Sequence, residues 1–344
     1  GFLNRGSHTT LSVYPGKRLD NNYSLNTVDI CPVGALTSKD FRFKMRVWFL
    51  KETMSIDVNC GTGTNILISS RENIVHRITP RDNDFVNSCW MPDSHRLNFH
   101  YLNGATRLLS PVVKGEEEPA KWSRALAAAA AQLQGRDPAK TAMVVSARMA
   151  NEELFLARRL ASALKIEDVD VLPRPQEGDG FLISADGNPN TSGAKLLGLA
   201  TGRLGHIAQG VASGRITGLV MLGEDAVDCG IAEENLEKLE MLVVTGILEN
   251  RTTPHATVLL PTSAWAEKRG TMINIKARLQ RLNQAIQPPG QARDDWEVLR
   301  DLVQAVGGSN GVYAIEEIFK LMEAEVSALR GLSISRIGDL GVQL

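Results

Sequence analysis

Four cysteines are the residues best suited to bind a soft metal: Cys31, Cys60, Cys89 and Cys229. Thiolates hold iron–sulfur clusters, and the last ligand of many bacterial clusters is followed by proline, as Cys31 is by Pro32. Proline fixes the backbone where the chain turns away from such a cluster. The Cys-Pro pair alone favours an ordinary buried thiol, because free cysteine is usually buried. No CxxC motif occurs in the chain, so the residues alone leave both interpretations open.

Other common catalytic signatures are missing from the sequence. Residues 61–66 read Gly-Thr-Gly-Thr-Asn-Ile and end in isoleucine where a dinucleotide-binding loop needs its third glycine. No GxxxxGK[ST] loop and no serine nucleophile elbow occurs. His95 and His100, with His76 nearby, match no tight zinc spacing, so we expect solvent-facing or hydrogen-bonded histidines.

Length and composition narrow the class of protein. The 344 residues favour two or three domains, and 38 basic against 39 acidic residues exclude a chain built mainly to bind nucleic acid. No apolar run reaches the roughly 18 residues of a membrane span. Four cysteines are too few for a disulfide scaffold and suggest a reducing compartment. Because the chain starts at Gly1 rather than Met, we interpret it as a fragment or a trimmed chain.

The elements that must position these residues follow from hydrophobic periodicity. Short apolar runs alternate with helical segments after residue 121, which predicts βαβ units and a parallel sheet. The predicted strands are residues 141–146, 180–185, 217–222, 241–245 and 256–260. The predicted helices are residues 122–133, 152–165 with Asn151 as the cap, 203–213 and 316–329. Earlier in the chain, residues 65–69 and 74–78 flank a turn and predict a small antiparallel module.

The segment from Asp29 to Leu50, DICPVGALTSKDFRFKMRVWFL, resembles the large iron–sulfur subunit of NADH:quinone oxidoreductase, respiratory complex I. The resemblance implies that Cys31 is the fourth ligand of a [4Fe–4S] cluster in the intact subunit. The other three ligands would come from a CxxCxxC motif upstream, which this chain does not contain. We therefore expect an amino-terminal truncation, and no cluster on Cys31 in the fragment itself.

The segment from Ser55 to Arg96 resembles the small domain that opens molybdopterin oxidoreductases and many of these subunits. That domain can hold a cluster on CxxCxxxC and a later cysteine, and the resemblance places these positions at Asp57, Cys60, Thr64 and Pro92. Proline cannot ligate iron, and threonine is a poor ligand beside thiolate. We expect a scaffold whose cluster is lost.

A third string, from Ala256 to Gln280, resembles the molybdopterin oxidoreductase pattern VLP, E..GT..N and R.Q. In active members of that family this region contributes to the pterin site. The alternative is a strand end and a loop packed under a helix. We expect no molybdopterin here, and we expect Thr271, Asn274, Arg278 and Gln280 to tie the loop to the following helix.

Together these observations predict an α/β fold: a cluster-domain remnant and an antiparallel module, followed by a parallel-sheet, molybdopterin-oxidoreductase-like domain. The predicted boundaries are 1–45 for the end of the [4Fe–4S] ferredoxin-like region, 46–105 for the module, 106–121 for a linker and 122–344 for the α/β domain. The resemblance implies an electron-transfer subunit of complex I with no catalytic residue of its own. It would contact the flavin-, NADH- and iron–sulfur-binding subunits of the peripheral arm, at the cytoplasmic face of a bacterial inner membrane. The alternatives are a molybdopterin enzyme of formate dehydrogenase type and a redox-inactive scaffold.

Overall fold

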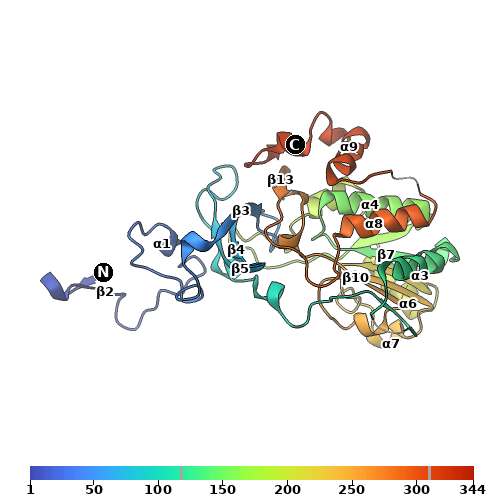
Figure 1. Ribbon diagram of the computed structural model, residues 1–344, viewed down its shortest axis with the longest axis horizontal. Helices are drawn as coiled ribbons and strands as arrows, with labels where there is room; N and C mark the ends of the chain where they lie inside the picture. Colours follow the sequence, from blue (N-terminus) through green and yellow to red (C-terminus); the bar gives the residue numbers. More distant parts are fainter. Residues whose placement is uncertain (117–118, 309–310) are drawn as a thin grey trace.

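A computed structural model describes residues 1–116, 119–308 and 311–344. The chain forms a broad α/β body that narrows toward the amino-terminal residues, which extend away from it (Figure 1). No helix within the described ranges is long and apolar enough to cross a membrane.

A six-stranded sheet forms the centre of the body, in the order β6-β11-β10-β9-β7-β8. The strands are β6 (Val112–Val113), β7 (Thr141–Val145), β8 (Asp168–Val171), β9 (Gly218–Leu222), β10 (Met241–Gly246) and β11 (Val258–Pro261). Neighbouring strands are parallel, except that β6 runs antiparallel to β11. The predicted parallel sheet is present, and its central strands are fully buried apolar runs, as parallel strands covered on both faces must be.

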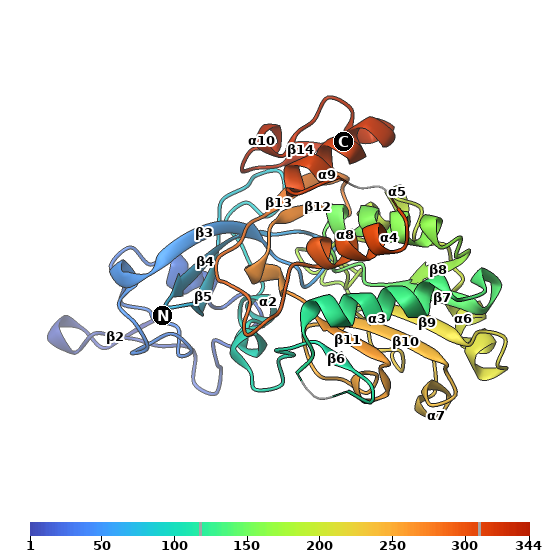
Figure 2. The same ribbon diagram turned by 45° about the vertical axis from the view of Figure 1, so that its right-hand side comes forward.

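Helices cover both faces of this sheet (Figure 2). One apolar cluster joins one set of strand side chains to α3 (Trp122–Gln134), α4 (Asn151–Ala163), α8 (Asp295–Ala305) and α9 (Ile315–Glu325). A second cluster joins the alternate side chains to α6 (Leu204–Ala212) and α7 (Glu233–Leu236). This part of the chain also contains two short helices, α5 (Thr191–Leu196) and α10 (Ile334–Ile337).

A three-stranded antiparallel sheet forms the predicted small module. It consists of β3 (Lys51–Ile56), β4 (Asn65–Arg71) and β5 (Ile74–Pro80), followed by the short helix α2 (Asp93–Arg96). A second small sheet of β12 (Gly270–Ile273), β13 (Arg278–Leu282) and β14 (Val342–Gln343) lies against the module. The two share one apolar core, which includes Ile66, Ile68, Trp265 and Leu282.

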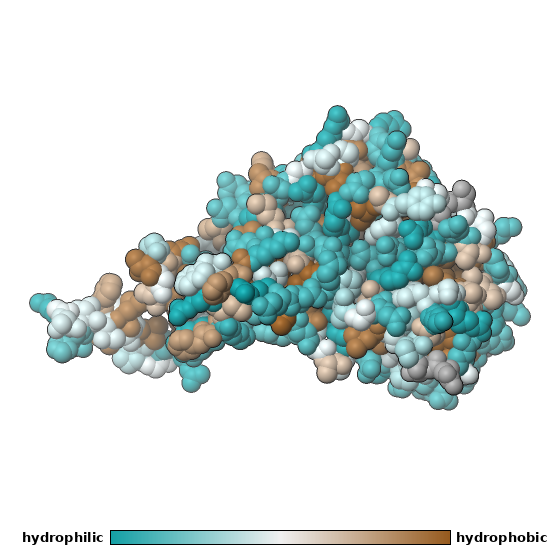
Figure 3. All heavy atoms as spheres, viewed as in Figure 1, coloured by the Kyte–Doolittle hydropathy of each residue, from teal (hydrophilic) through white to brown (hydrophobic). Residues whose placement is uncertain are grey.

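The amino-terminal residues contain little regular structure. The strands β1 (Phe2–Leu3) and β2 (Thr10–Leu11) pair with each other, and α1 (Asn26–Asp29) is a single turn. Large apolar side chains are exposed here, among them Val33, Phe43 and Trp48. Hydrophobic atoms accordingly show on the narrow end of the molecule (Figure 3).

The structure corrects several sequence predictions. Residues 180–185 form a loop rather than a strand, and Phe181 is exposed there and packs on Tyr23. Asn151 is the first residue of α4 rather than its cap, because its side chain is used instead to contact Thr271. Residues 278–282 form β13, so a strand rather than a helix follows the turn at 274–277.

The segment predicted as a linker is integrated into the α/β body. Its apolar residues form β6 at the edge of the main sheet, and Leu108 is buried. Arg107, 5% exposed, lies in a buried ion pair with Glu267. Two prolines and a run of acidic residues predicted a linker. Val112 and Val113, which follow the first proline, instead form the edge strand β6.

Candidate functional site

Cys31 lies just after α1, at the start of a tight irregular loop. Its thiol is partly exposed. The backbone N–H groups of the residues that follow, that of Leu36 first and then those of Ala35 and Val33, lower the pKa of Cys31. A lowered pKa favours the thiolate, which is the form that ligates iron. Cys31 therefore fits the chemistry of one cluster ligand.

The four module positions lie together at the end of the β3–β4 hairpin and the start of α2. Asp57, Cys60 and Thr64 are buried, and Pro92 is the residue that precedes α2. Asp57 N–H donates to the Thr64 carbonyl at 2.8 Å, which continues the pairing of β3 with β4. One thiol cannot hold a [4Fe–4S] cube, so this donor set does not fit that cluster.

His95 lies beside Asp57 and Cys60 in the interior of the module. It lies three residues after Pro92, and its Nδ1 is 2.6 Å from Asp57 Oδ2. Burial alone would lower the pKa of His95, but the facing Asp57 carboxylate outweighs it, so the pKa is raised. Asp57, Cys60 and His95 each present one potential ligand atom, and these atoms lie within 4.8 Å of one another.

The other two histidines do not join this group. His100 is half exposed and contacts Asp40, and His76 lies on β5. The expectation of hydrogen-bonded or solvent-facing histidines is confirmed for His95 and His100, but their sequence spacing gave no sign that His95 faces Asp57. The signal available was its place one helical turn beyond Pro92, which brings it to the same end of the module.

Two segments from elsewhere in the chain cover the site. Cys60 Sγ lies 3.6 Å from the Leu182 carbonyl, and Gly61 N–H donates to the Asp186 carbonyl at 2.9 Å. From the amino-terminal side, the Tyr23 hydroxyl hydrogen-bonds Asp179. The unpredicted 178–186 loop is therefore what closes the module site.

Two residues of the string at 270–280, Asn274 and Gln280, contact this same module rather than a following helix. Asn274 Nδ2 donates to the Thr62 carbonyl at 3.0 Å, and Gln280 Nε2 donates to the Gly63 carbonyl at 2.8 Å. The approach is so close that a Cβ built on Gly61 would lie 2.4 Å from Ile275 Cγ2, and one on Gly63 would lie 2.4 Å from Gln280 Oε1.

The other two residues of this string are also occupied by protein groups. Thr271 Oγ1 donates to Glu152 at 2.8 Å, and Arg278 donates to the Gly341 carbonyl at 2.8 Å. All four side chains are buried, so they are not available to a pterin, and the residues do not fit that cofactor.

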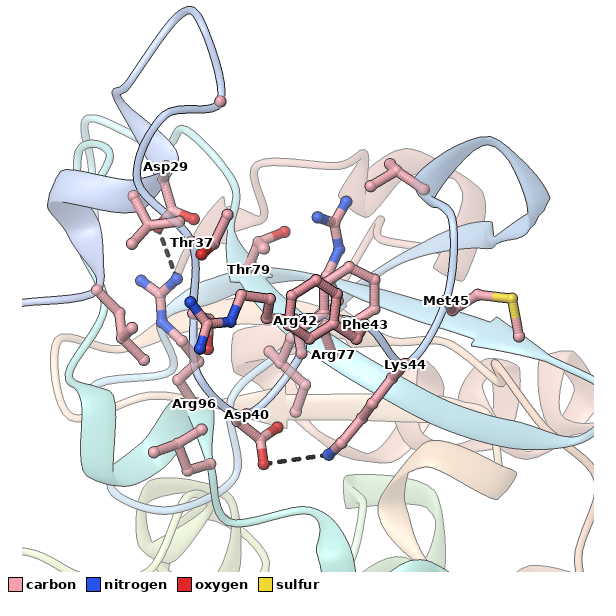
Figure 4. A pocket seen from close by; sticks show the side chains of 18 of the residues that line it. Asp29, Thr37, Asp40, Arg42, Phe43, Lys44, Met45, Arg77, Thr79 and Arg96 are labelled. Atoms are coloured by element: carbon pink, nitrogen blue, oxygen red, sulfur yellow. Dashed lines mark hydrogen bonds and ion pairs between the residues drawn. The ribbon is translucent and has the colours of Figure 1, made fainter.

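A cavity of about 800 Å³ lies between residues 25–49 and the module (Figure 4). Its lining includes basic and aromatic side chains, and the Arg42 guanidinium lies 5.0 Å from the centre of the Phe43 ring. The ion pair of Asp29 with Arg96, at 2.7 Å, closes one end. This cavity lies between the Cys31 segment and the module, and it contains neither candidate ligand set.

The α/β domain, preceded by the antiparallel module and the Cys31 segment, is similar to domains of known proteins. A family model described as molybdopterin oxidoreductase matches residues 174–305. Acetylene hydratase from Pelobacter acetylenicus has the same fold, with a TM-score of 0.53 and 11% identity over 83% of this chain and 73% of that one. The predicted fold class is confirmed.

Two further family models identify the amino-terminal parts. The ferredoxin-like domain of NADH-quinone oxidoreductase subunit 3 matches residues 1–37, and the NDSU1/NuoG-like 4Fe-4S domain of NADH-ubiquinone oxidoreductase matches residues 50–100. The resemblance to the large iron–sulfur subunit of NADH:quinone oxidoreductase is thereby confirmed.

Similar proteins carry the corresponding names. A subunit of the NADH-quinone oxidoreductase of Rickettsia felis is 38% identical over 166 residues, which are 48% of this chain and 25% of that protein. The mitochondrial 78 kDa subunit of the NADH-ubiquinone oxidoreductase of Neurospora crassa is 44% identical over 140 residues, 40% of this chain and 19% of that protein. The 78 kDa subunit of Candida albicans is 26% identical and covers 88% of this chain and 59% of the relative. The matched stretches therefore span a quarter or less of the first two relatives.

Proposed function

We propose that this chain is part of an electron-transfer subunit of an NADH:quinone oxidoreductase, in which Cys31 ligates a [4Fe–4S] cluster. The observation that carries the proposal is the partly exposed Cys31 thiol, whose pKa the following backbone N–H groups lower, within the segment that the ferredoxin-like family model matches. A cluster held there would supply one-electron transfer. The role of this chain is to supply a thiolate ligand from Cys31.

The remaining parts of the chain are proposed to serve as a scaffold. Residues 46–105 carry the positions Asp57, Cys60, Thr64 and Pro92 without a [4Fe–4S] cluster, since only one of the four is a thiol. Residues 122–344 brace the subunit without molybdopterin, because Asn274 and Gln280 bind the module instead. The partners are the flavin-, NADH- and iron–sulfur-binding subunits of the peripheral arm, on the cytoplasmic face of a bacterial inner membrane.

The test is Cys31→Ser in the intact subunit, with Cys229→Ser as the matched control, since Cys229 is buried in the α/β domain. Cys31→Ser should remove or distort one cluster signal in low-temperature EPR and slow electron transfer to quinone, because a cube lacking one thiolate leaves an iron open. Cys229→Ser should leave both unchanged. Unchanged spectra and turnover in Cys31→Ser would refute the electron-transfer role and favour a redox-inactive scaffold. Pterin released from the purified protein, or molybdenum bound to it, would favour the alternative of a pterin-dependent enzyme.

A further inference from the structure

Asp57, Cys60 and His95 form a buried group with the three side-chain chemistries that zinc binds most often. Their exposures are 2%, 1% and 7%, so all three are shielded from bulk water. They come from two separate parts of the module, the end of the β3–β4 hairpin and α2. A single divalent ion needs fewer ligands than a [4Fe–4S] cluster, so these three side chains could hold one where they could not hold a cluster.

The distances suit one ion after a small adjustment. Zinc bonds of about 2.0–2.3 Å in a tetrahedron place ligand atoms roughly 3.3–3.8 Å apart. The ligand atoms here lie within 4.8 Å of one another, and the His95–Asp57 contact is 2.6 Å. Binding therefore requires His95 Nδ1 and Asp57 Oδ2 to separate by about 0.7 Å and Cys60 Sγ to approach them by roughly 1 Å. Rotations of the side chains can supply shifts of this size.

Independent features mark the same place as prepared for a ligand. Thr64 is 1% exposed, and its hydroxyl has no hydrogen-bond partner among the residues that the structure describes. Because Thr64 pairs with Asp57 across the antiparallel ladder, the two side chains share one face of the hairpin. A buried, unpaired hydroxyl costs free energy unless water or an ion satisfies it.

A second layer of side chains orients the carboxylate. Asn59 Nδ2 donates to Asp57 Oδ1 at 2.6 Å, and Asn98 Nδ2 donates to Asn59 Oδ1 at 2.5 Å. Asp57 Oδ1 is thus held by amides while Oδ2 faces His95. Such outer-layer hydrogen bonds fix a ligand's orientation in metal sites.

We propose that Asp57, Cys60 and His95 bind one divalent transition-metal ion, with Zn²⁺ as the best match, at the place where relatives of this module hold a cluster. The thiolate and imidazole favour zinc over Mg²⁺ or Ca²⁺, which prefer oxygen ligands. Binding expels the Cys60 thiol proton and any proton shared by His95 and Asp57 to solvent, and no electron is transferred. The fourth position is open to a water beside Thr64. The ion would join β3, β4 and α2 where the cluster once did, independently of the electron-transfer role of Cys31.

The test uses the whole chain, produced with Zn²⁺ or Co²⁺ in the medium and dialysed before metal analysis. We expect about one ion per chain, and for Co²⁺ a thiolate-to-metal charge-transfer band with the visible absorption of four-coordinate cobalt. Cys60→Ser should remove the charge-transfer band, and His95→Gln should weaken binding. Cys89→Ser, which changes an exposed thiol of the same module, should alter neither.

Asn59→Ala separates a prepared site from adventitious binding. It removes no ligand, yet it should weaken metal affinity by about 10-fold, because it frees the Asp57 carboxylate to rotate. Circular dichroism of each variant confirms that it is folded. Absence of bound metal and of the cobalt band in the wild-type chain would overturn the proposal. Equal binding by the wild-type chain and folded Cys60→Ser and His95→Gln variants would overturn it as well.

Discussion

The Cys31 segment and the Asp57 module present their candidate ligand residues in opposite ways. The Cys31 thiol is partly exposed, and backbone N–H groups of the following residues lower its pKa. Asp57, Cys60 and His95 are instead buried, and their ligand atoms lie within 4.8 Å of one another. The first region thus offers a single side chain, whereas the second brings three side chains of this chain together in its interior.

Thiol labelling should show this contrast most directly. Cys31 should react with iodoacetamide faster than Cys60 by more than about 100-fold, because the thiolate is the nucleophile and a buried thiol must wait for a local opening of ~3 kcal/mol or more. Mass spectrometry of peptides after timed quenching measures both rates. The exposed Cys89 is the control for access, and Cys229, whose pKa burial raises to about 12, should stay unlabelled. Comparable rates for Cys31 and Cys60 would remove the distinction between the two regions.

Breaking the buried ion pair of Arg107 with Glu267 inside the α/β body should cost the most stability. Arg107 makes two hydrogen bonds of 2.6 and 2.7 Å to Glu267, and both side chains are at most 3% exposed. Arg107→Ala should lower the free energy of unfolding by about 3–5 kcal/mol, because it leaves Glu267 buried and unpaired. Urea denaturation measures the change. Arg124→Ala removes an exposed pair with Glu116 and should leave stability nearly unchanged.

The α/β body should also show a pH dependence that the exposed amino-terminal region lacks. Burial raises the pKa of Glu152 to about 7, from an ordinary value of 4.5. Between these values the folded chain binds a proton that the unfolded chain does not, so this contribution to stability is full below about pH 4.5 and is lost as the pH rises through about 7. The loss is about 3 kcal/mol.

Glu152→Gln should therefore gain up to about 3 kcal/mol of stability relative to wild type between pH 5 and pH 8. Urea titrations across that range would show the gain. Glu316→Gln, at a more exposed carboxyl whose pKa is lowered, is the matched control. A difference between Glu152→Gln and wild type that does not vary with pH would contradict the assignment.

The smallest effect is expected at the attachment of the Cys31 segment. Asn26 is 2% exposed and pairs with both the N–H and the carbonyl of Met91, at 3.0 and 2.8 Å. Asn26→Ala should cost about 1–3 kcal/mol, since it leaves buried backbone groups unpaired. Because Asn26 is the one buried residue among residues 1–50, the variant should lose protection there first in hydrogen exchange. Asn21→Ala, at an exposed position, should not.

The sequence predicted the parts of the fold that are governed by continuous burial. Strands β7, β9 and β10 are uninterrupted buried runs and follow the predicted ranges closely, and so does α3. Strand β3 escaped notice because its first three residues are all polar and only its last two are buried. The apolar run at 180–185 was misleading, because Phe181 packs across the chain on Tyr23.

The candidate sites divide in the same way. The sequence around Cys31 indicates a candidate ligand by itself, because Cys31, Pro32 and the residues whose N–H groups lower the pKa of Cys31 follow one another closely in the chain. The contact of His95 with Asp57 joins residues 38 positions apart and depends on how α2 folds back on the hairpin. No spacing rule encodes that contact, so it required the structure.

The close approach of the 61–64 loop to residues 274–280 has a consequence for motion. With no room for even a Cβ at Gly61 or Gly63, and with Asn274 and Gln280 bonded across the contact, the module and the α/β body lack the slack that a hinge requires. They should tumble as one rigid unit. Residues 1–50 are joined to that unit by fewer buried contacts, so collective domain movement in this chain should be concentrated between the Cys31 segment and the rest of the molecule.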